Sequence, residues 1–233
     1  MDPADSSTRS CSDSPYTTGV PSARSRRRAW FATAGKDRMM TDSQYQSPDP
    51  KDPVGSTDAI ADIQARCDAL ATRILRRCAD DGLKIAAAES LTGGLLADAF
   101  VRIPGASAVF LGSAVTYDIR AKHGILGVDA TLLGREGAVH PDVARQMAAA
   151  TARLYAPHGE GGMVIGLSTT GVAGPGPDGD KPAGLVYVGV AMPARRSADE
   201  AEALELHLHG TREEVRRQTV LRALEAIATR LGA

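Results

Sequence analysis

Ser90 combines a residue type that can act as a nucleophile with a position at which such a residue could meet a substrate. It follows the small apolar run 85–88 and precedes an apolar-periodic segment that begins at Leu95. This pattern predicts a buried strand that turns into a helix, which lifts the serine to the carboxyl edge of a sheet, where open α/β folds bind ligands. A serine at a helix start can instead be an N-cap, and position alone favours that alternative.

Thr92, Gly93 and Gly94 follow directly and are expected to form the first turn of a helix over residues 92–102. The unpaired N–H groups of such a turn would point at the same edge of the sheet, and the two glycines would let a substrate approach them closely. These donors would suit the oxyanion that forms when Ser90 attacks a carbonyl. The local sequence is not Gly-x-Ser-x-Gly, which excludes the usual hydrolase nucleophile elbow.

A nucleophilic serine needs a base. No Ser/His/Asp arrangement emerges from the histidines, which are His123, His140, His158, His207 and His209. Lys122 follows Tyr117 by five residues, where an expected strand ends and a short helix begins. Strand ends converge on one edge of a sheet, so Ser90, Tyr117 and Lys122 could meet there. A desolvated lysine can lose its proton near neutral pH and act as a base, although Lys122 taken alone is more often a surface charge.

A second candidate site is the glycine-rich stretch "STTGVAGPG" at 168–176, which follows an expected buried strand and includes Thr170, Gly171 and Gly174. It could cradle an anion, but no Gly-Lys-Ser/Thr follows, so it is not a P-loop. A Gly/Pro loop is by itself more often a simple turn. Arg212, at the start of the last expected helix, could hold a phosphate with two hydrogen bonds, although surface ion pairing is the common outcome for such an arginine.

The chain has three cysteines, Cys11, Cys67 and Cys78, and this odd, sparse set favours a reducing, cytoplasmic location. Cys67 and Cys78 are eleven residues apart, which places them on one face of a helix. We expect both to be small core residues. No Cys-x-x-Cys or His-x-x-x-His spacing supports a metal site, and neither a metal nor a cofactor is predicted.

Bulk properties exclude several classes of protein. A net charge of −1 is not that of a protein whose whole surface binds nucleic acid. No apolar run approaches the roughly 18 residues that span a membrane. Residues 1–56 are polar and basic with almost no apolar periodicity, so we expect a disordered N-terminal tail followed by one globular domain over residues 57–233.

Helices and strands are expected to alternate through that domain, which predicts an α/β fold, a three-layer sandwich with a mostly parallel or mixed sheet and helices on both faces. Strands are predicted at 84–89, 108–117, 163–169 and 185–192, and a half-exposed strand at 204–208. Helices are predicted at about 58–81, 92–102, 118–124, from Pro141 onwards, and at 212–231.

Taken together, an ordered set of motifs resembles the C-terminal domain of the competence/damage-inducible protein CinA, the nicotinamide-nucleotide amidohydrolase family. The resemblance covers about residues 60–231. Its motifs are Glu89-Ser90-x-Thr92-Gly93-Gly94, Pro104-Gly105-Ala106-Ser107 with Phe110, Val115-x-Tyr117 with Lys122, Leu126-Gly127-Val128, Gly137-Ala138-Val139, Thr170-Gly171-x-Ala173-Gly174-Pro175, Lys181-Pro182-x-Gly184 and Arg212.

The resemblance implies a hydrolase that deamidates nicotinamide mononucleotide (NMN) to nicotinic acid mononucleotide and ammonia, in pyridine nucleotide (NAD) salvage. It implies catalytic roles for Ser90, Tyr117 and Lys122, ligand contacts near Thr170, and an active-site arginine, assigned here to Arg212. It also implies a homodimer. Residues 1–56 are too short and too polar to form the N-terminal molybdopterin-binding-like domain of longer CinA proteins, so the chain resembles the stand-alone form.

Two departures from the family pattern stand out: Leu91, where the family often has cysteine, and His140, where the family usually begins a helix with serine. We expect Leu91 to point away from the site, and Pro141 or Asp142 to start the helix in place of serine. Two other functions remain open. One is a nucleotide-binding or regulatory module without turnover, and the other is an amidase that acts on a different amide.

Overall fold

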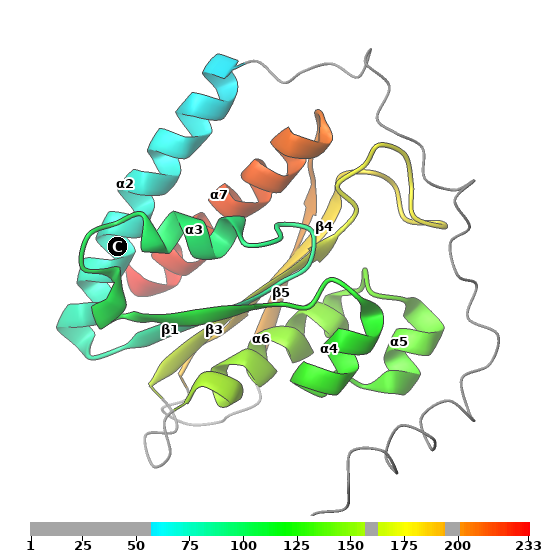
Figure 1. Ribbon diagram of the computed structural model, residues 1–233, viewed down its shortest axis with the longest axis horizontal. Coiled ribbons are helices and arrows are strands. Elements are labelled where there is room, and N and C mark those ends of the chain that lie inside the picture. The colour runs from blue at the N-terminus through cyan, green and yellow to red at the C-terminus, as the bar shows by residue number, and fades with distance from the viewer. Residues whose placement is uncertain (1–56, 157–162, 194–200) are drawn as a thin grey trace, which may run out of the picture. The chain divides into compact units, whose positions relative to one another are not determined.

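The computed structural model describes residues 57–156, 163–193 and 201–233, so the expected disordered tail, residues 1–56, lies outside the described residues. Helices and strands alternate in the first part of the described chain, and a run of three helices and then a run of three strands precede the last helix (Figure 1). In chain order the elements are α2 (Thr57–Asp81), β1 (Lys84–Glu89), α3 (Leu95–Val101), the 3₁₀ helix η2 (Ala106–Ala108), β2 (Phe110–Val115), α4 (Ile119–Leu126), α5 (Ala130–Glu136), α6 (Pro141–Tyr155), β3 (Val164–Gly171), β4 (Leu185–Ala191), β5 (Ala201–His207) and α7 (Arg212–Leu231).

The strands that the structure describes form one five-stranded mixed sheet in the order β2-β1-β3-β4-β5. Strand β1 pairs in parallel with both β2 and β3, whereas β4 and β5 are antiparallel to their neighbours. Glu89, at the end of β1, lies beside Val115 on β2 and Thr169 on β3. Three consecutive strands of the sheet therefore end at one edge, and the segments that leave them are brought together there.

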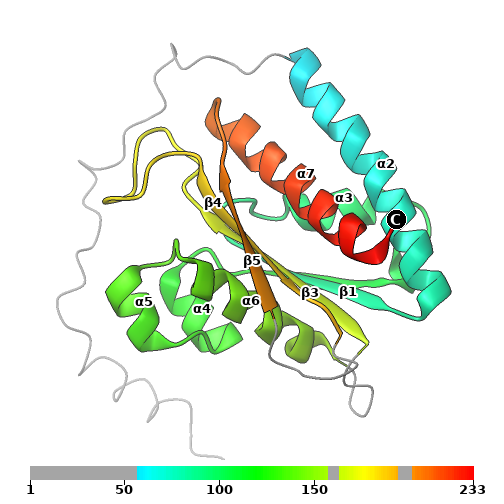
Figure 2. The same ribbon diagram turned by 180° about the vertical axis from the view of Figure 1, so that it is seen from behind.

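Helices cover both faces of the sheet (Figures 1 and 2). Helices α2, α3 and α7 lie on one face, and α4, α5 and α6 lie on the other. Each face has its own core, because alternate residues of the strands point to opposite sides. In β1, for example, Ile85 and Ala87 join the apolar cluster under α2, α3 and α7, whereas Ala88 joins the cluster under α4, α5 and α6. This arrangement confirms the predicted α/β fold with helices on both faces.

Helix α6 lies very close to the sheet because glycines face it. A Cβ placed on Gly166 in β3 would lie 2.0 Å from the carbonyl oxygen of Ala148, and one on Gly189 in β4 would lie 2.3 Å from that of Ala144. Neither contact is compatible with a side chain, so both positions require glycine. The close packing fixes β3, and with it the residues at the end of β3, against α6.

Several local predictions are tested by the described elements. Strand β1 and helix α7 have the predicted bounds, and Cys67 and Cys78 are both buried, as expected. Helix α3 begins at Leu95 rather than at residue 92. Helix α5 was not predicted. Within the described ranges, no helix is both long enough and apolar enough to cross a membrane.

Candidate active site

Ser90 and Lys122 meet in the interior of the protein. Lys122 Nζ lies 3.0 Å from Ser90 Oγ. Lys122 is fully buried, and Ser90 is only 8% exposed. Ser90 directly follows β1, while Lys122 lies in the first turn of α4, which follows β2 and is capped by Asp118. The two parallel strands therefore bring together residues that are 32 positions apart in the sequence.

The partners of the Lys122 amine define how it can act on Ser90. Nζ also lies 2.6 Å from the carbonyl oxygen of Thr116 and 3.4 Å from that of Tyr117. A carbonyl oxygen can only accept a hydrogen bond, so these two contacts use two N–H groups of the amine. In a neutral amine the remaining tetrahedral position is a lone pair, and Ser90 Oγ is the remaining contact. The site can therefore present a lone pair to the serine hydroxyl.

Burial also favours the neutral form of this amine. Desolvation lowers the pKa of Lys122 from 10.5 to about 8, and the charge of Asp118 opposes this shift only in part. The pKa of Asp118 itself is lowered to about 2, chiefly by its hydrogen bonds from Arg120. At pH 7 about a tenth of Lys122 is thus unprotonated, which is the form that a general base requires.

The interpretation of Ser90 as the N-cap of α3 is wrong. The helix begins at Leu95 after a turn in which Gly93 and Gly94 have left-handed φ angles of 54° and 100°. Its N-terminal N–H groups are taken up by the buried Glu89 carboxylate instead. Glu89 accepts five hydrogen bonds at 2.8 to 3.0 Å, from Thr92 Oγ1, Ser113 Oγ and the N–H groups of Gly94, Leu96 and Ala97.

This arrangement also corrects the predicted oxyanion donors. The N–H of Gly94 donates to Glu89, and that of Gly93 donates to the carbonyl oxygen of Ser90, so neither is free for a substrate. Within the described part of the chain, the N–H groups of Leu91 and Thr92 donate to no protein acceptor, although both residues are buried. Buried N–H groups without partners are rare, and these two lie immediately after Ser90.

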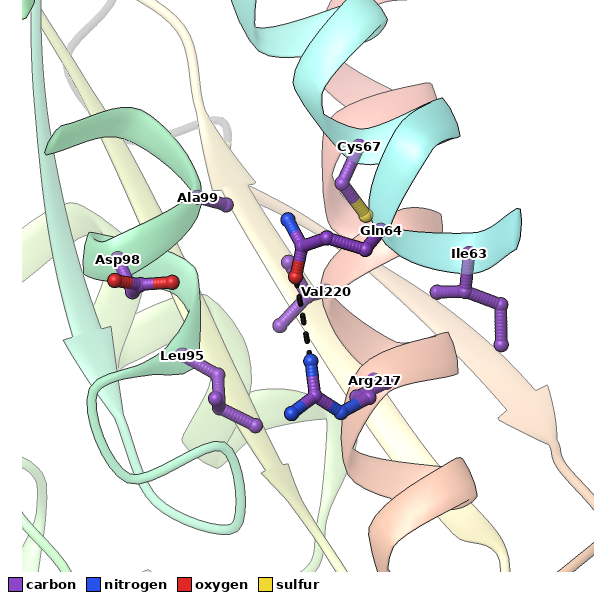
Figure 3. Close-up of a pocket in the computed structure, with 8 residues that line it drawn as sticks. All are labelled: Ile63, Gln64, Cys67, Leu95, Asp98, Ala99, Arg217 and Val220. Carbon is purple, nitrogen blue, oxygen red and sulfur yellow. Dashed lines mark hydrogen bonds between the residues drawn. The ribbon is translucent and has the colours of Figure 1, made fainter. Parts of the chain in front are cut away.

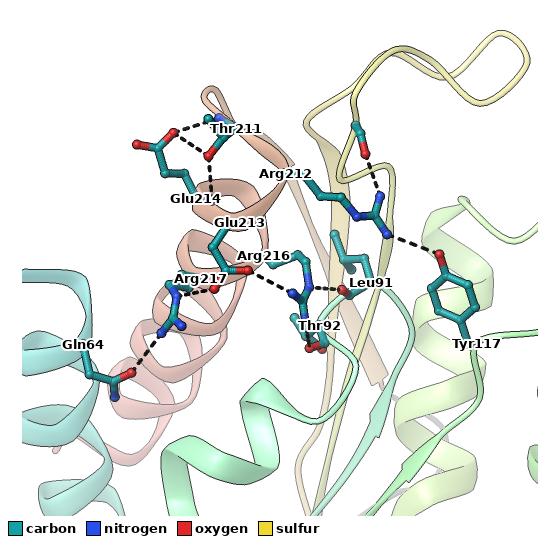
Figure 4. Close-up of polar contacts among 11 residues, drawn as sticks. Gln64, Leu91, Thr92, Tyr117, Thr211, Arg212, Glu213, Glu214, Arg216 and Arg217 are labelled. Carbon is teal, nitrogen blue, oxygen red and sulfur yellow. Dashed lines mark hydrogen bonds and ion pairs between the residues drawn. The ribbon is translucent and has the colours of Figure 1, made fainter. Parts of the chain in front are cut away.

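Tyr117 and Arg212 lie together beside the glycine-rich loop (Figure 4). Arg212 Nη1 donates to the carbonyl oxygen of Gly174 at 2.6 Å, and Nη2 donates to the Tyr117 hydroxyl at 3.3 Å. Tyr117 is 64% exposed. Its side chain is thus engaged with the arginine, and a proton relay through Tyr117 is not needed, because Lys122 reaches Ser90 directly.

The hydroxyl groups of the two threonines predicted to contact a ligand form hydrogen bonds with other groups of the protein. Thr92 Oγ1 bonds to Glu89 and to Thr169 Oγ1, and Thr170 Oγ1 donates to the carbonyl oxygen of Ala138. A Cβ on Gly171 would lie 2.6 Å from the carbonyl oxygen of Leu185, so this glycine serves the pairing of β3 with β4. The threonine hydroxyls therefore position the loops around Ser90 in this structure.

His140 and Glu89 both have structural roles at the start of a helix. Helix α6 begins at Pro141, as expected, and the side chain of His140 caps it, because its Nδ1 accepts the N–H of Asp142 at 3.2 Å. The role of Glu89 was missed, although a carboxylate directly before Ser90 and five residues before Gly94 was a usable signal. Across the described residues, no three His, Cys, Asp or Glu side chains gather closely enough to hold a metal ion.

Two hollows lie away from this site. One is a cavity of about 10 Å³ between α2, α3 and α7, with room for about one water molecule (Figure 3). The other is an open groove between β5 and α7. Neither is lined by Ser90 or Lys122. The candidate catalytic residues therefore lie outside both hollows, at the ends of β1 and β2.

Known proteins with a similar sequence are competence-related bacterial proteins. The chain is 44% identical over 147 residues to a putative competence-damage inducible protein of Clostridium novyi, which is 63% of this chain and 33% of that protein. It is 42% identical over 149 residues to a CinA-like protein of Frankia casuarinae, covering 64% and 32%. The chain thus spans about a third of the length of the curated relatives it matches.

Solved structures share the fold of this chain over most of their own length. The competence/damage inducible protein CihA from Agrobacterium tumefaciens matches with a TM-score of 0.63 and 35% identity, over 72% of this chain and 96% of that one. A CinA superfamily protein from Escherichia coli matches with a TM-score of 0.59 and 28% identity, over 77% and 94%. The model of the CinA C-terminal domain matches residues 67–231. The chain therefore belongs to the CinA C-terminal domain family.

Proposed function

We propose that this chain is a serine amidohydrolase that deamidates NMN to nicotinic acid mononucleotide and ammonia. The observation that carries the proposal is the 3.0 Å contact between Ser90 Oγ and the fully buried amine of Lys122. A nucleophile and a base within hydrogen-bond reach are the minimum for acyl transfer. The choice of NMN as the amide follows from membership of the family and from the cationic residue beside the glycine-rich loop.

In the proposed reaction, neutral Lys122 accepts the proton of Ser90 as Oγ bonds to the carboxamide carbon. The resulting lysine ammonium then gives a proton to the leaving nitrogen, the C–N bond breaks, and ammonia departs. Water next attacks the acyl ester, delivers its proton to Lys122, and releases the carboxylate product and the free serine. Each proton that Lys122 takes up is returned in the following step, so one residue acts as base and then as acid.

The unpaired N–H groups of Leu91 and Thr92 are the proposed donors to the oxyanion. They belong to the two residues that follow the nucleophile, and burial strengthens such donors because water does not compete with them. Arg212 is the proposed phosphate contact. It is exposed and, at the end of α7 that faces the glycine-rich loop, its guanidinium can bind a phosphate through two parallel hydrogen bonds.

The proposed function also bears on the type of substrate and on the cellular location. The proposed substrate is a small nucleotide, and the buried free thiols of Cys67 and Cys78 are consistent with a reducing, cytoplasmic location. A homodimer remains a proposal, tested by measuring the molar mass of the purified protein in solution.

The test is ammonia release from NMN by the wild type and by Ser90→Ala, with nicotinamide riboside as a substrate that lacks the phosphate. We expect release by the wild type, a loss of at least about 1,000-fold in Ser90→Ala, and a much higher KM for the riboside. Binding of NMN without ammonia release would favour a non-catalytic nucleotide-binding module. Equal rates with both substrates would refute the phosphate contact and favour an amidase of broader specificity.

A further inference from the structure

Arg216 holds the backbone of the segment that follows Ser90. From the second turn of α7, its Nε donates to the carbonyl oxygen of Leu91 at 2.9 Å, and its Nη2 donates to that of Thr92 at 3.0 Å (Figure 4). Its Nη1 donates to Glu213 at 2.9 Å. The guanidinium is thus engaged on all three nitrogens, so its contacts are with the protein rather than with a substrate.

The two carbonyl contacts determine where the neighbouring N–H groups point. In a trans peptide the C=O and the following N–H point in opposite directions. Because Arg216 holds the carbonyl of Leu91, the N–H of Thr92 is directed away from the guanidinium. The adjacent peptide is fixed in the same way, since the carbonyl of Thr92 is held by Arg216 and the N–H of Gly93 donates to the carbonyl of Ser90.

The same segment is held from its other end by Glu89. That carboxylate binds the side chain of Thr92 and the N–H groups that begin α3, including that of Gly94. The turn is therefore fixed by an anion on its N–H side and a cation on its C=O side. The N–H groups of Leu91 and Thr92 are the donors of the turn that stay unpaired within the described residues, and both residues are buried.

We infer that Arg216 is a positioning residue for the amide hydrolysis proposed above, because it orients the Thr92 N–H that stabilises the oxyanion. The positive charge next to the Leu91 carbonyl also polarises that peptide group, which strengthens its N–H as a donor. The inference rests on the proposed function for its substrate, but the geometric claim concerns any reaction in which Ser90 attacks an electrophile.

Arg217 offers a matched control on the same helix. Its side chain is 27% exposed against 26% for Arg216, and both arginines form an ion pair with Glu213. Its remaining contact is Nη1 with Gln64 Oε1 on α2 at 3.2 Å, and not with the carbonyl groups of the Ser90 turn (Figures 3 and 4). Replacing either arginine by methionine keeps most of the aliphatic stem and removes the same charge, but only Arg216→Met releases the two carbonyl groups.

The experiment measures kcat and KM for NMN, and separately the second-order rate at which a small fluorophosphonate labels Ser90, in the wild type, Arg216→Met, Arg216→Lys and Arg217→Met. In labelling, Ser90 Oγ bonds to phosphorus, Lys122 takes the proton and fluoride leaves, so this readout needs no amide substrate. We expect Arg216→Met to lower both kcat and the labelling rate by about 10- to 100-fold, with KM changed by less than about 3-fold. Arg217→Met is expected to stay within about 3-fold of the wild type.

Arg216→Lys keeps the charge but loses the planar fork that binds two carbonyls at once, so its kcat is expected to lie between those of the wild type and Arg216→Met. If Arg216→Met does not fold, this variant decides the question. Equal losses in the two methionine variants, or a rise in KM with kcat unchanged, would overturn the inference while the proposed function stands. If the wild type labels at Ser90 but releases no ammonia from NMN, the proposed function fails and the labelling rates alone decide the inference. A wild type that neither labels nor releases ammonia overturns both.

Discussion

Replacing Lys122 by methionine is expected to change the stability of the protein in a way that depends on pH. Lys122 is fully buried, and its pKa is lowered to about 8 because the charged amine is desolvated. Below this pH the folded protein must carry a buried ammonium, which is unfavourable. Methionine has a similar length and no charge, so Lys122→Met removes that penalty, together with the hydrogen bonds to Ser90 Oγ and to the carbonyls of Thr116 and Tyr117.

The size of the effect follows from the two pKa values. A fall from 10.5 to about 8 corresponds to about 3 kcal/mol, at about 1.4 kcal/mol for each unit of pKa. Between about pH 8 and 10.5 the unfolded lysine still binds a proton while the folded one does not, so wild-type stability rises with pH. The unfolding free energy of the methionine variant minus that of the wild type is therefore largest at neutral pH, and this difference falls by about 3 kcal/mol by pH 10.5. The loss of three hydrogen bonds, about 1 kcal/mol each, lowers the stability of the methionine variant by the same amount at every pH.

The assay is urea denaturation of both proteins, followed by circular dichroism, at intervals from pH 7 to 10.5. The difference between their unfolding free energies cancels the titration of all other groups. Arg217→Met is a suitable control, because it removes a cation that does not titrate in this range. A difference between wild type and Lys122→Met that stays constant over these pH values would show that folded Lys122 has an ordinary pKa, and would refute the assignment of a neutral amine as the base.

Two further predictions concern the same site. The kcat/KM for NMN is expected to rise about tenfold per pH unit below about pH 8 and to level off above it, because the neutral form of Lys122 is the active one and its pKa is about 8. Ammonia release measured from pH 6 to 9.5 tests this, and a flat profile would contradict it. Glu89→Gln is expected to lower the unfolding free energy by about 3 kcal/mol, since an amide nitrogen in place of Oε2 cannot accept the hydrogen bonds from Thr92 Oγ1 and from the N–H groups of Gly94 and Leu96. Urea denaturation measures it, with Glu136→Gln, which alters a surface ion pair with Arg135, as a control whose stability should match that of the wild type.

The sequence was sufficient to predict the elements that carry strong periodicity. The apolar run of β1 and the apolar face of α7 were found at their correct bounds, because burial on both faces or on one stripe leaves a clear pattern. The meeting of Ser90 and Lys122 was also foreseeable, since parallel strands end at one edge. Helix α5 was missed because it buries only Leu132 and Leu133, which are adjacent in the sequence and so show no helical periodicity.

The details of the Ser90 turn could not be read from the sequence in the same way. A serine followed by Thr-Gly-Gly is typical of a helix start, and local propensity therefore favoured Ser90 as the cap. The buried Glu89 overrides this preference, because it accepts the N–H of the cap residue Gly94 and two N–H groups of α3. Gly93 and Gly94 meanwhile adopt left-handed conformations that other residues rarely do. The signal for Arg216 was its position four residues after Arg212, which places both on one side of α7, but only the structure shows that it reaches two carbonyls.

The chemistry of the charged residues around Ser90 explains why each stands where it does. An arginine cannot give up its proton in a protein, so Arg216 holds the carbonyls of Leu91 and Thr92 with a charge that does not change during turnover. A lysine can lose its proton when it is desolvated, and Lys122 is the cation that contacts Ser90 Oγ. If the two residue types were exchanged, the turn would lose its rigid fork and the serine would face a permanent cation that cannot accept its proton. A permanent charge at Arg216 and a titratable amine at Lys122 are thus the arrangement that a nucleophilic Ser90 requires, and this supports the assignment of Ser90 as the nucleophile.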